Sequence, residues 1–175
     1  MNFTFENLDE ETRALMISEI NYDIDNQKLY LSKRFNDNGN KLYTKLLLDA
    51  AEFGNENTLA ISLKDNNCFA DKEVRNGKNG IISAKIPDTA NITLADSEFN
   101  RFYIRALAQR AIASGQKLIV YRARHSDKPR LDSEDKIGSE ILPEDLLKDL
   151  RENIGIDTIL GLPAGPNSGL SVRLN

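Results

Sequence analysis

The sequence predicts an α+β fold with a helix-rich N-terminal part, a long central helix packed on a small sheet, and an extended C-terminal arm. Two patterns carry this prediction. Apolar residues recur at three- and four-residue intervals, the spacing of one helix face, over much of 8–63 and again over 94–114. Short runs rich in β-branched residues follow. Because 175 residues fit one domain, we expect a single domain over 1–160 and an arm or edge strand over 161–175.

Three helices are predicted in the N-terminal third, over 8–22, 41–53 and 56–63. Asn7 and Glu10 have the spacing of a capping box, which satisfies backbone donors at a helix start. The polar run 36–40 is typical of a turn before the second helix. Gly54 is placed to end the second helix, and Asn55 to cap the third.

The central part is predicted to contain an exposed loop or flexible hairpin over 65–80, a strand over 81–86, a helix over 94–114 and a strand over 117–122. Thr93 is the expected N-cap of this helix, with Asp96 favourable in its first turn and Gly115 as its C-cap. The β-branched pair Ile119 and Val120 at the centre of the last strand suits a sheet interior.

After a charged loop over 125–138, Pro143 suits the first position of a further helix that Gly155 ends. Segments 158–162 and 170–174 are expected to be short strands or parts of an extended arm. In the last segment Leu170, Val172 and Leu174 alternate, as an added strand requires. We therefore predict a docking arm over 160–175, and the alternative is an edge strand folded onto its own sheet.

Basic residues are concentrated in one segment of the chain. Residues 101–130 contain eight Lys or Arg and one acid, whereas the whole chain has a net charge of −4. Such asymmetry indicates an acidic partner surface, a polyanion or another copy of the chain. We favour protein contacts over nucleic acid because a sequence pI of about 5.1 is low for a nucleic-acid-binding domain. The expected interface residues are Arg101, Arg105, Arg122, Arg124, Arg130, Leu170, Val172 and Leu174. Their expected partners are acids of a neighbouring copy such as Asp132, Glu134, Glu144 and Asp145.

The sequence offers no convincing catalytic, metal or cofactor site. One His and one Cys do not supply a closed zinc shell. His125 is followed by Ser and Asp, but consecutive residues rarely face one another as a catalytic triad does. The acidic run 132–135 lacks the spaced ligands of a calcium loop, and 161–169 lacks the Gly-Lys-Ser/Thr of a phosphate loop. We expect no enzymatic activity, no cofactor and no metal.

The sequence also predicts where the chain resides. No apolar run approaches the roughly 18 residues that a membrane helix needs. The first residues lack the basic start and apolar core of a signal peptide. The single Cys68 fits a reducing compartment. We therefore expect a protein made in a cytoplasm, without a membrane partner.

Two segments, 98–105 (EFNRFYIR) and 163–174 (PAGPNSGLSVRL), resemble segments of uncharacterised proteins encoded in the structural modules of tailed phages and prophages. The resemblance implies a bacteriophage virion component of the head–tail connector, head-completion or capsid-decoration type, without catalytic activity. Its implied partners are copies of itself and neighbouring structural proteins. The alternative from the residues alone is a small cytoplasmic enzyme or a nucleotide- or nucleic-acid-binding protein that uses the basic segment 101–130.

Overall fold

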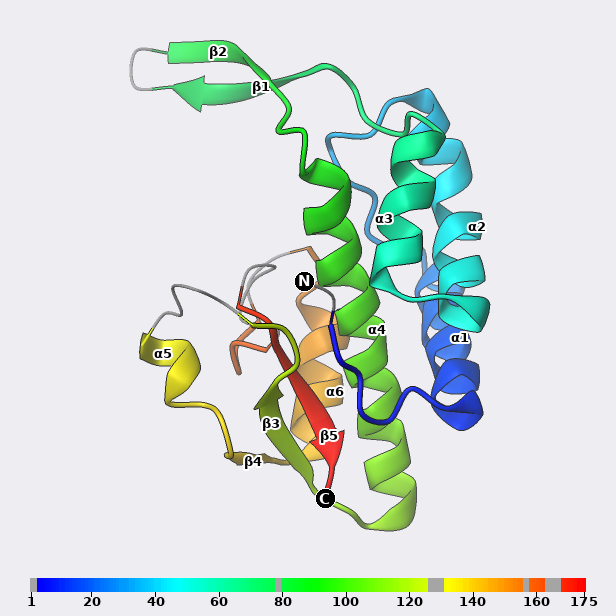
Figure 1. Ribbon diagram of the computed structural model, residues 1–175, viewed down its shortest axis with the longest axis vertical. Helices are drawn as coiled ribbons and strands as arrows, with labels where there is room; N and C mark the ends of the chain where they lie inside the picture. Colours follow the sequence, from blue (N-terminus) through cyan, green and yellow to red (C-terminus); the bar gives the residue numbers. More distant parts are fainter. Residues whose placement is uncertain (1–2, 78–79, 126–130, 156–157, 163–167) are drawn as a thin grey trace.

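The computed structural model describes residues 3–77, 80–125, 131–155, 158–162 and 168–175. It has the predicted α+β architecture with a helix-rich N-terminal part (Figure 1). The helices are α1 (Glu10–Asp25), α2 (Asp37–Phe53), α3 (Glu56–Asp65), α4 (Ala90–Ser114), α5 (Leu131–Glu134) and α6 (Pro143–Glu152). The strands are β1 (Lys72–Gly77), β2 (Gly80–Lys85), β3 (Leu118–Arg122), β4 (Glu140–Ile141) and β5 (Leu170–Leu174). Among these helices none is both long and apolar enough to cross a bilayer.

The long helix α4 is the axis of the fold. It packs against α1, α3 and α6, and also against β5 (Figure 1). Because neighbours surround it, every side chain from Glu98 to Ala108 is buried, including charged ones. A helix covered on all sides needs no polar face. Its aromatic residues Phe99, Phe102 and Tyr103 form the centre of the core.

The C-terminal strand belongs to this core. β3 lies between β4 and β5, and both pairings are antiparallel. In the β3–β5 register, Val120 faces Val172, and both side chains are buried. The predicted strand at 170–174 is therefore confirmed, but it folds onto its own sheet as an edge strand. The docking-arm prediction is wrong for this strand, because its apolar side chains fill the space beside α4. Residues 163–167 of the predicted arm lie outside the described residues.

The other strand predicted near the C-terminus, at 158–162, is not formed. This segment is a turn, in which the Thr158 hydroxyl accepts from the backbone N of Leu162 and donates to the same residue's carbonyl. The turn is also held from α6, where the carboxylate of Asp149 accepts from the backbone N of Ile159 and of Leu160. Buried side-chain acceptors thus take the place of a strand partner.

Three helix starts differ from the prediction. For α1 and α2 a different residue caps the first backbone donors, and α4 begins earlier in the chain. Asp9 rather than Asn7 caps α1, since its carboxylate accepts from the backbone N of Thr12. Asn36 caps α2, so the predicted turn at 36–40 is the first turn of that helix. α4 begins at Ala90, four residues before the predicted start. The cap predicted at Asn55 for α3 is confirmed.

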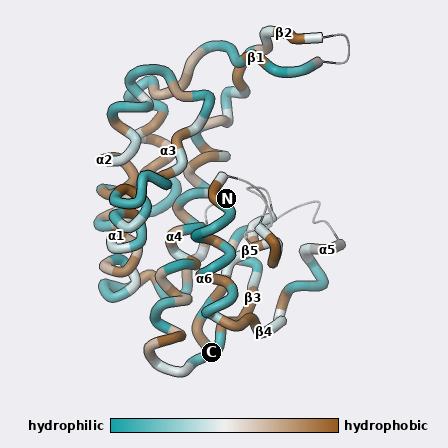
Figure 2. The backbone as a smooth tube through the Cα atoms, turned by 180° about the vertical axis from the view of Figure 1, so that it is seen from behind, coloured by the Kyte–Doolittle hydropathy of each residue, from teal (hydrophilic) through white to brown (hydrophobic). Residues whose placement is uncertain are grey.

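The strands β1 and β2 form an antiparallel hairpin that projects from the helices (Figure 1). Its register pairs Lys72 with Lys85 at the base and Gly77 with Gly80 near the tip. Figure 2 shows hydrophobic residues on β2, away from the body of the molecule. The segment predicted as an exposed loop or flexible hairpin is therefore a regular two-stranded arm.

Candidate functional site

The described part of the basic segment, residues 101–125, lies largely in the interior. Arg105 is fully buried in α4, where its Nε donates to Glu19 Oε2 at 2.6 Å and its Nη1 donates to Asp23 Oδ2 at 2.7 Å. Both acids come from α1, and Arg151 of α6 also pairs with Glu19. The carboxyl of Glu19 is buried, but these two guanidinium groups hold its pKa below the ordinary value. This network joins three helices, so the expectation that Arg105 faces a neighbouring subunit is corrected.

Arg101, one turn earlier, is also buried. Its Nη1 donates to the carbonyl oxygens of Leu150 at 3.2 Å and Asn153 at 2.9 Å, where α6 ends. Its Nε lies 3.8 Å from Glu98 Oε1, and burial raises the pKa of that carboxyl. Helix C-termini leave carbonyl groups without intrahelical partners, and Arg101 satisfies two of them. It is an internal helix cap rather than an interface residue.

Two further arginines pair with acids of the same chain. Arg122 pairs with Glu134 of its own chain. The sequence predicts that Glu134 pairs with an arginine of a neighbouring copy. Arg124 pairs with Asp96 and lies over the ring of Phe3, 5.0 Å from its centre. Burial raises the pKa of Asp96 to about 6, although Arg124 acts in the opposite direction. The predicted pairing of these two arginines with acids of a neighbouring copy is therefore corrected, because both pair with acids of their own chain.

The remaining predicted interface residues also do not form an exposed site. Leu170 and Val172 are fully buried, and Leu174 is half-buried against the core. Arg130 lies outside the described residues. The predicted set is thus not gathered on one surface, and its buried members are corrected to residues of the core.

The hairpin is one feature of the described residues that is open to a partner. Its side chains are exposed on one face and nearly so on the other. Val74 is 76% exposed and Ile81 is 77% exposed, and the register places them as diagonal neighbours on the same face as Lys72 and Lys85. A two-stranded hairpin is marginally stable by itself in water. Exposed β-branched residues on such an arm are typical of a surface that another molecule covers.

The base of the hairpin is fixed to the helices by several contacts. The side-chain amide of Asn36 donates to the carbonyls of Asn67 and Phe69. Glu73 of β1 accepts a bidentate pair of hydrogen bonds from Arg34, at 2.7 and 2.9 Å. The Arg34 guanidinium also lowers the pKa of the Glu73 carboxyl. The hairpin is therefore held at a defined angle to α2 and α3.

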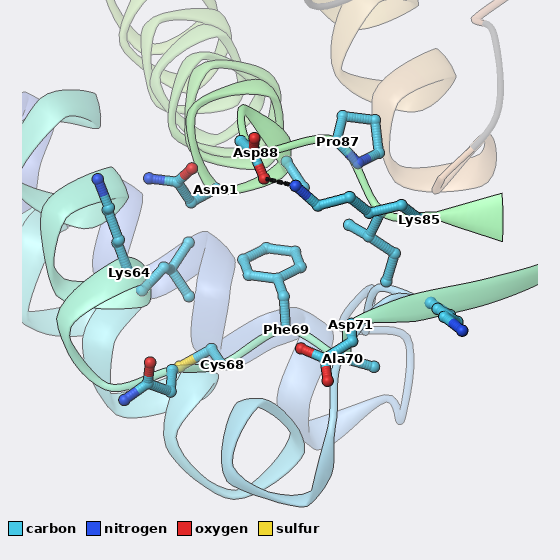
Figure 3. Close-up of a pocket in the computed structure, with 14 residues that line it drawn as sticks. Lys64, Cys68, Phe69, Ala70, Asp71, Lys85, Pro87, Asp88 and Asn91 are labelled. Atoms are coloured by element: carbon cyan, nitrogen blue, oxygen red, sulfur yellow. Dashed lines mark ion pairs between the residues drawn. The ribbon is translucent and has the colours of Figure 1, made fainter.

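An open hollow of about 420 Å³ lies where the hairpin leaves the helices. Figure 3 shows the ring of Phe69 near its middle, with Asn91 of α4 and Lys64 of α3 on one side. At its mouth, Lys85 Nζ and Asp88 Oδ1 form an ion pair of 2.8 Å (Figure 3). The walls carry charges of both signs and the floor is apolar. The residues that line the hollow present no arrangement of a nucleophile and a base.

Sequence reasoning located the hairpin segment but did not predict the two paired strands or the exposure of Val74 and Ile81. The two strands do not show a clean alternation of apolar and polar residues, since 72–76 contain only one apolar residue and Ile81 and Ile82 are adjacent. The signal that was available is the sequence Gly-Lys-Asn-Gly at 77–80, whose composition is typical of a hairpin turn. Within the part of the chain that the structure describes, no three His, Cys, Asp or Glu side chains gather as metal ligands would.

Comparison with known proteins finds no matching family model, no matching curated protein and no matching solved structure.

Proposed function

We propose that this chain is a non-enzymatic structural subunit that works as a homo-oligomer, with the β1–β2 hairpin as its contact arm. The observation that carries the proposal is the exposure of Val74 and Ile81 on an arm whose base is fixed and whose length is uncovered. Burying these two side chains against another copy removes apolar surface from water, which is the main driving force of association.

The internal pairing of the basic segment also favours this proposal over an enzyme or a nucleic-acid-binding protein. Nucleic-acid binding needs cations that reach phosphates. Arg101 and Arg105 are buried, and Arg122 and Arg124 pair with acids of the same chain. These four arginines hold α4 and β3 to the neighbouring elements of the same chain. A rigid body with one projecting arm suits a particle component, and the resemblance to phage structural modules leads us to propose a tailed-phage virion subunit.

Sedimentation velocity of the purified chain over a wide range of concentrations tests the proposal. We expect the wild-type protein to form oligomers, and the double variant Val74→Asp/Ile81→Asp to sediment as a monomer at the same concentrations. Both side chains are exposed, so the helical circular dichroism signal should be unchanged. Ile159→Asp is the matched control, because Ile159 is 83% exposed but lies far along the chain from the hairpin. This variant should assemble as the wild type does.

Two results would contradict the proposal. One is a wild-type protein that stays monomeric at every concentration. The other is a hairpin variant that assembles like the wild type, since the arm would then have no part in the contact.

A further inference from the structure

An exposed aromatic residue lies beside two acids at the end of α2. Phe53, the last residue of this helix, is 80% exposed. Asp49 and Glu52 precede it by four and one residues and are also exposed. Residues three and four apart are neighbours on a helix surface, so Asp49 adjoins both Glu52 and Phe53. We call Asp49, Glu52 and Phe53 the Phe53 patch.

The turn that follows the Phe53 patch is fixed. Arg13 of α1 donates through Nη1 to the carbonyl of Ala51 at 2.8 Å and through Nη2 to the carbonyl of Gly54 at 2.9 Å. Asn55 and Thr58 add a reciprocal capping box at the start of α3. A patch on a fixed backbone loses little conformational freedom when a partner binds it.

We propose that the partner of the Phe53 patch is the hairpin of a second copy of this chain; this inference rests on the proposed function. The outer hairpin face has Val74 and Ile81 along its length and Lys72 and Lys85 at its base. The patch has an aromatic ring with two carboxylates beside it. The two surfaces are complementary in both hydrophobicity and charge. An aromatic anchor with polar residues at its edge is the usual form of an interface centre.

Charge also argues against a contact between two hairpins. Lys72 and Lys85 lie directly opposite each other in the register. Placing this face against its own copy base to base would bring four ammonium groups together, and like charges at close range are unfavourable. The ion pair of Lys85 with Asp88 is exposed on both sides, so it neutralises this face only in part. The acidic Phe53 patch presents the opposite sign, and docking there brings unlike charges together.

The positions of the two surfaces determine the kind of assembly. The Phe53 patch precedes the first residue of α3, and the hairpin follows its last residue, so the two lie toward opposite ends of that helix (Figure 1). A contact between different surfaces of two identical chains is heterologous and leaves one hairpin and one patch unused. Repetition of the same contact gives a ring when the rotation closes and a filament when it does not.

Mixing two variants tests the inference. The first, Val74→Asp/Ile81→Asp, has an intact patch, and the second, Phe53→Asp, has an intact hairpin. Each variant alone should sediment as a monomer. Their equimolar mixture should form a one-to-one dimer that grows no further, because one working hairpin then meets one working patch. The dimer should weaken as salt rises, since screening acts on the pairs between lysines and carboxylates.

A second patch variant, Asp49→Lys/Glu52→Lys, keeps Phe53 and reverses two exposed charges. It should also lose self-assembly, because its patch and its hairpin then carry the same sign. Adding Lys72→Glu/Lys85→Glu chains should restore assembly, with the two kinds of chain alternating, since each patch again meets a hairpin of opposite charge. The Ile159→Asp variant should assemble as the wild type does.

Two outcomes overturn the inference: wild-type-like assembly of Phe53→Asp, or a mixture of the hairpin variant and Phe53→Asp that stays monomeric. If the hairpin variant alone loses assembly, the proposed function survives either outcome. A monomeric wild type overturns both proposals.

Discussion

Ser171 of β5 donates its hydroxyl to Asn100 Oδ1 of α4 at 2.7 Å, and both side chains are buried. The amide of Asn100 in turn donates to the carbonyl of Leu170 at 2.8 Å. These two hydrogen bonds join the central helix to the last strand. A buried polar group left without its partner costs about 1–3 kcal/mol, so the pair depends on both elements being present.

Removal of 170–175 should therefore unfold the protein rather than only prevent assembly. The truncation exposes Val120 and removes both hydrogen-bond partners of Asn100. We expect early melting or aggregation of the truncated chain, measured by circular dichroism and light scattering. A truncated monomer that keeps the wild-type melting temperature would contradict this assignment and return the segment to the role of an arm.

Replacing Arg105 should be among the most damaging single changes to stability. Arg105→Met removes the cation that Glu19 and Asp23 share in the interior. Loss of one partner from a buried ion pair costs about 3–5 kcal/mol, because the remaining charges stay buried. Arg173→Met is the matched control, since Arg173 pairs with Glu6 at the surface, where such pairs contribute at most about 1 kcal/mol. Urea unfolding of both variants measures the difference in unfolding free energy. Equal losses of unfolding free energy would show that the buried network contributes no more to stability than the surface pair.

A close approach between two backbones should make Gly39 hard to replace. A Cβ at Gly39 would lie 2.2 Å from the carbonyl oxygen of Cys68 and 2.7 Å from the ring of Phe35. Gly39→Ala should therefore cost about 1–3 kcal/mol of unfolding free energy, as overpacking does. It should also loosen the segment that leads into β1. Asn40→Ala, at an exposed position in the same helix, is the control and should change the unfolding free energy little. If thermal unfolding shows Asn40→Ala to be less stable than Gly39→Ala, the close approach is refuted.

The buried carboxyl of Asp96 should make stability depend on pH. Its pKa rises from the ordinary 3.8 to about 6 in the folded state. Between these values the folded protein keeps a proton that the unfolded chain has lost, so stability falls as pH rises from about 4 to 6. The loss is on the order of 3 kcal/mol. In Asp96→Asn this part of the slope should be absent when unfolding free energy is measured across the range. A variant with the wild-type slope would show that Asp96 is not the titrating group.

The helices and the candidate functional surface were not equally predictable from the sequence. Local signals decided the helices, so Asn55, Pro143 and Gly115 lie at the helix ends where their capping properties place them. The basic segment led to a wrong prediction of interface residues, because a count of charges does not tell whether an arginine faces solvent or a buried acid. Glu19 lies 86 positions from Arg105 in the chain, and no local pattern connects them. The sequence also did not determine whether β5 is a docking arm or an edge strand, because alternating apolar residues suit both.

Amide hydrogen exchange at low and high protein concentration tests the central claim most directly. An uncovered hairpin exchanges its amides readily, whereas a docked hairpin is protected. We predict that peptides covering 72–85 and 49–53 become protected as concentration rises and the sedimenting mass increases, while exchange in α4 stays unchanged. Assembly without any change in exchange over 72–85, or exchange that is independent of concentration throughout, would contradict the account.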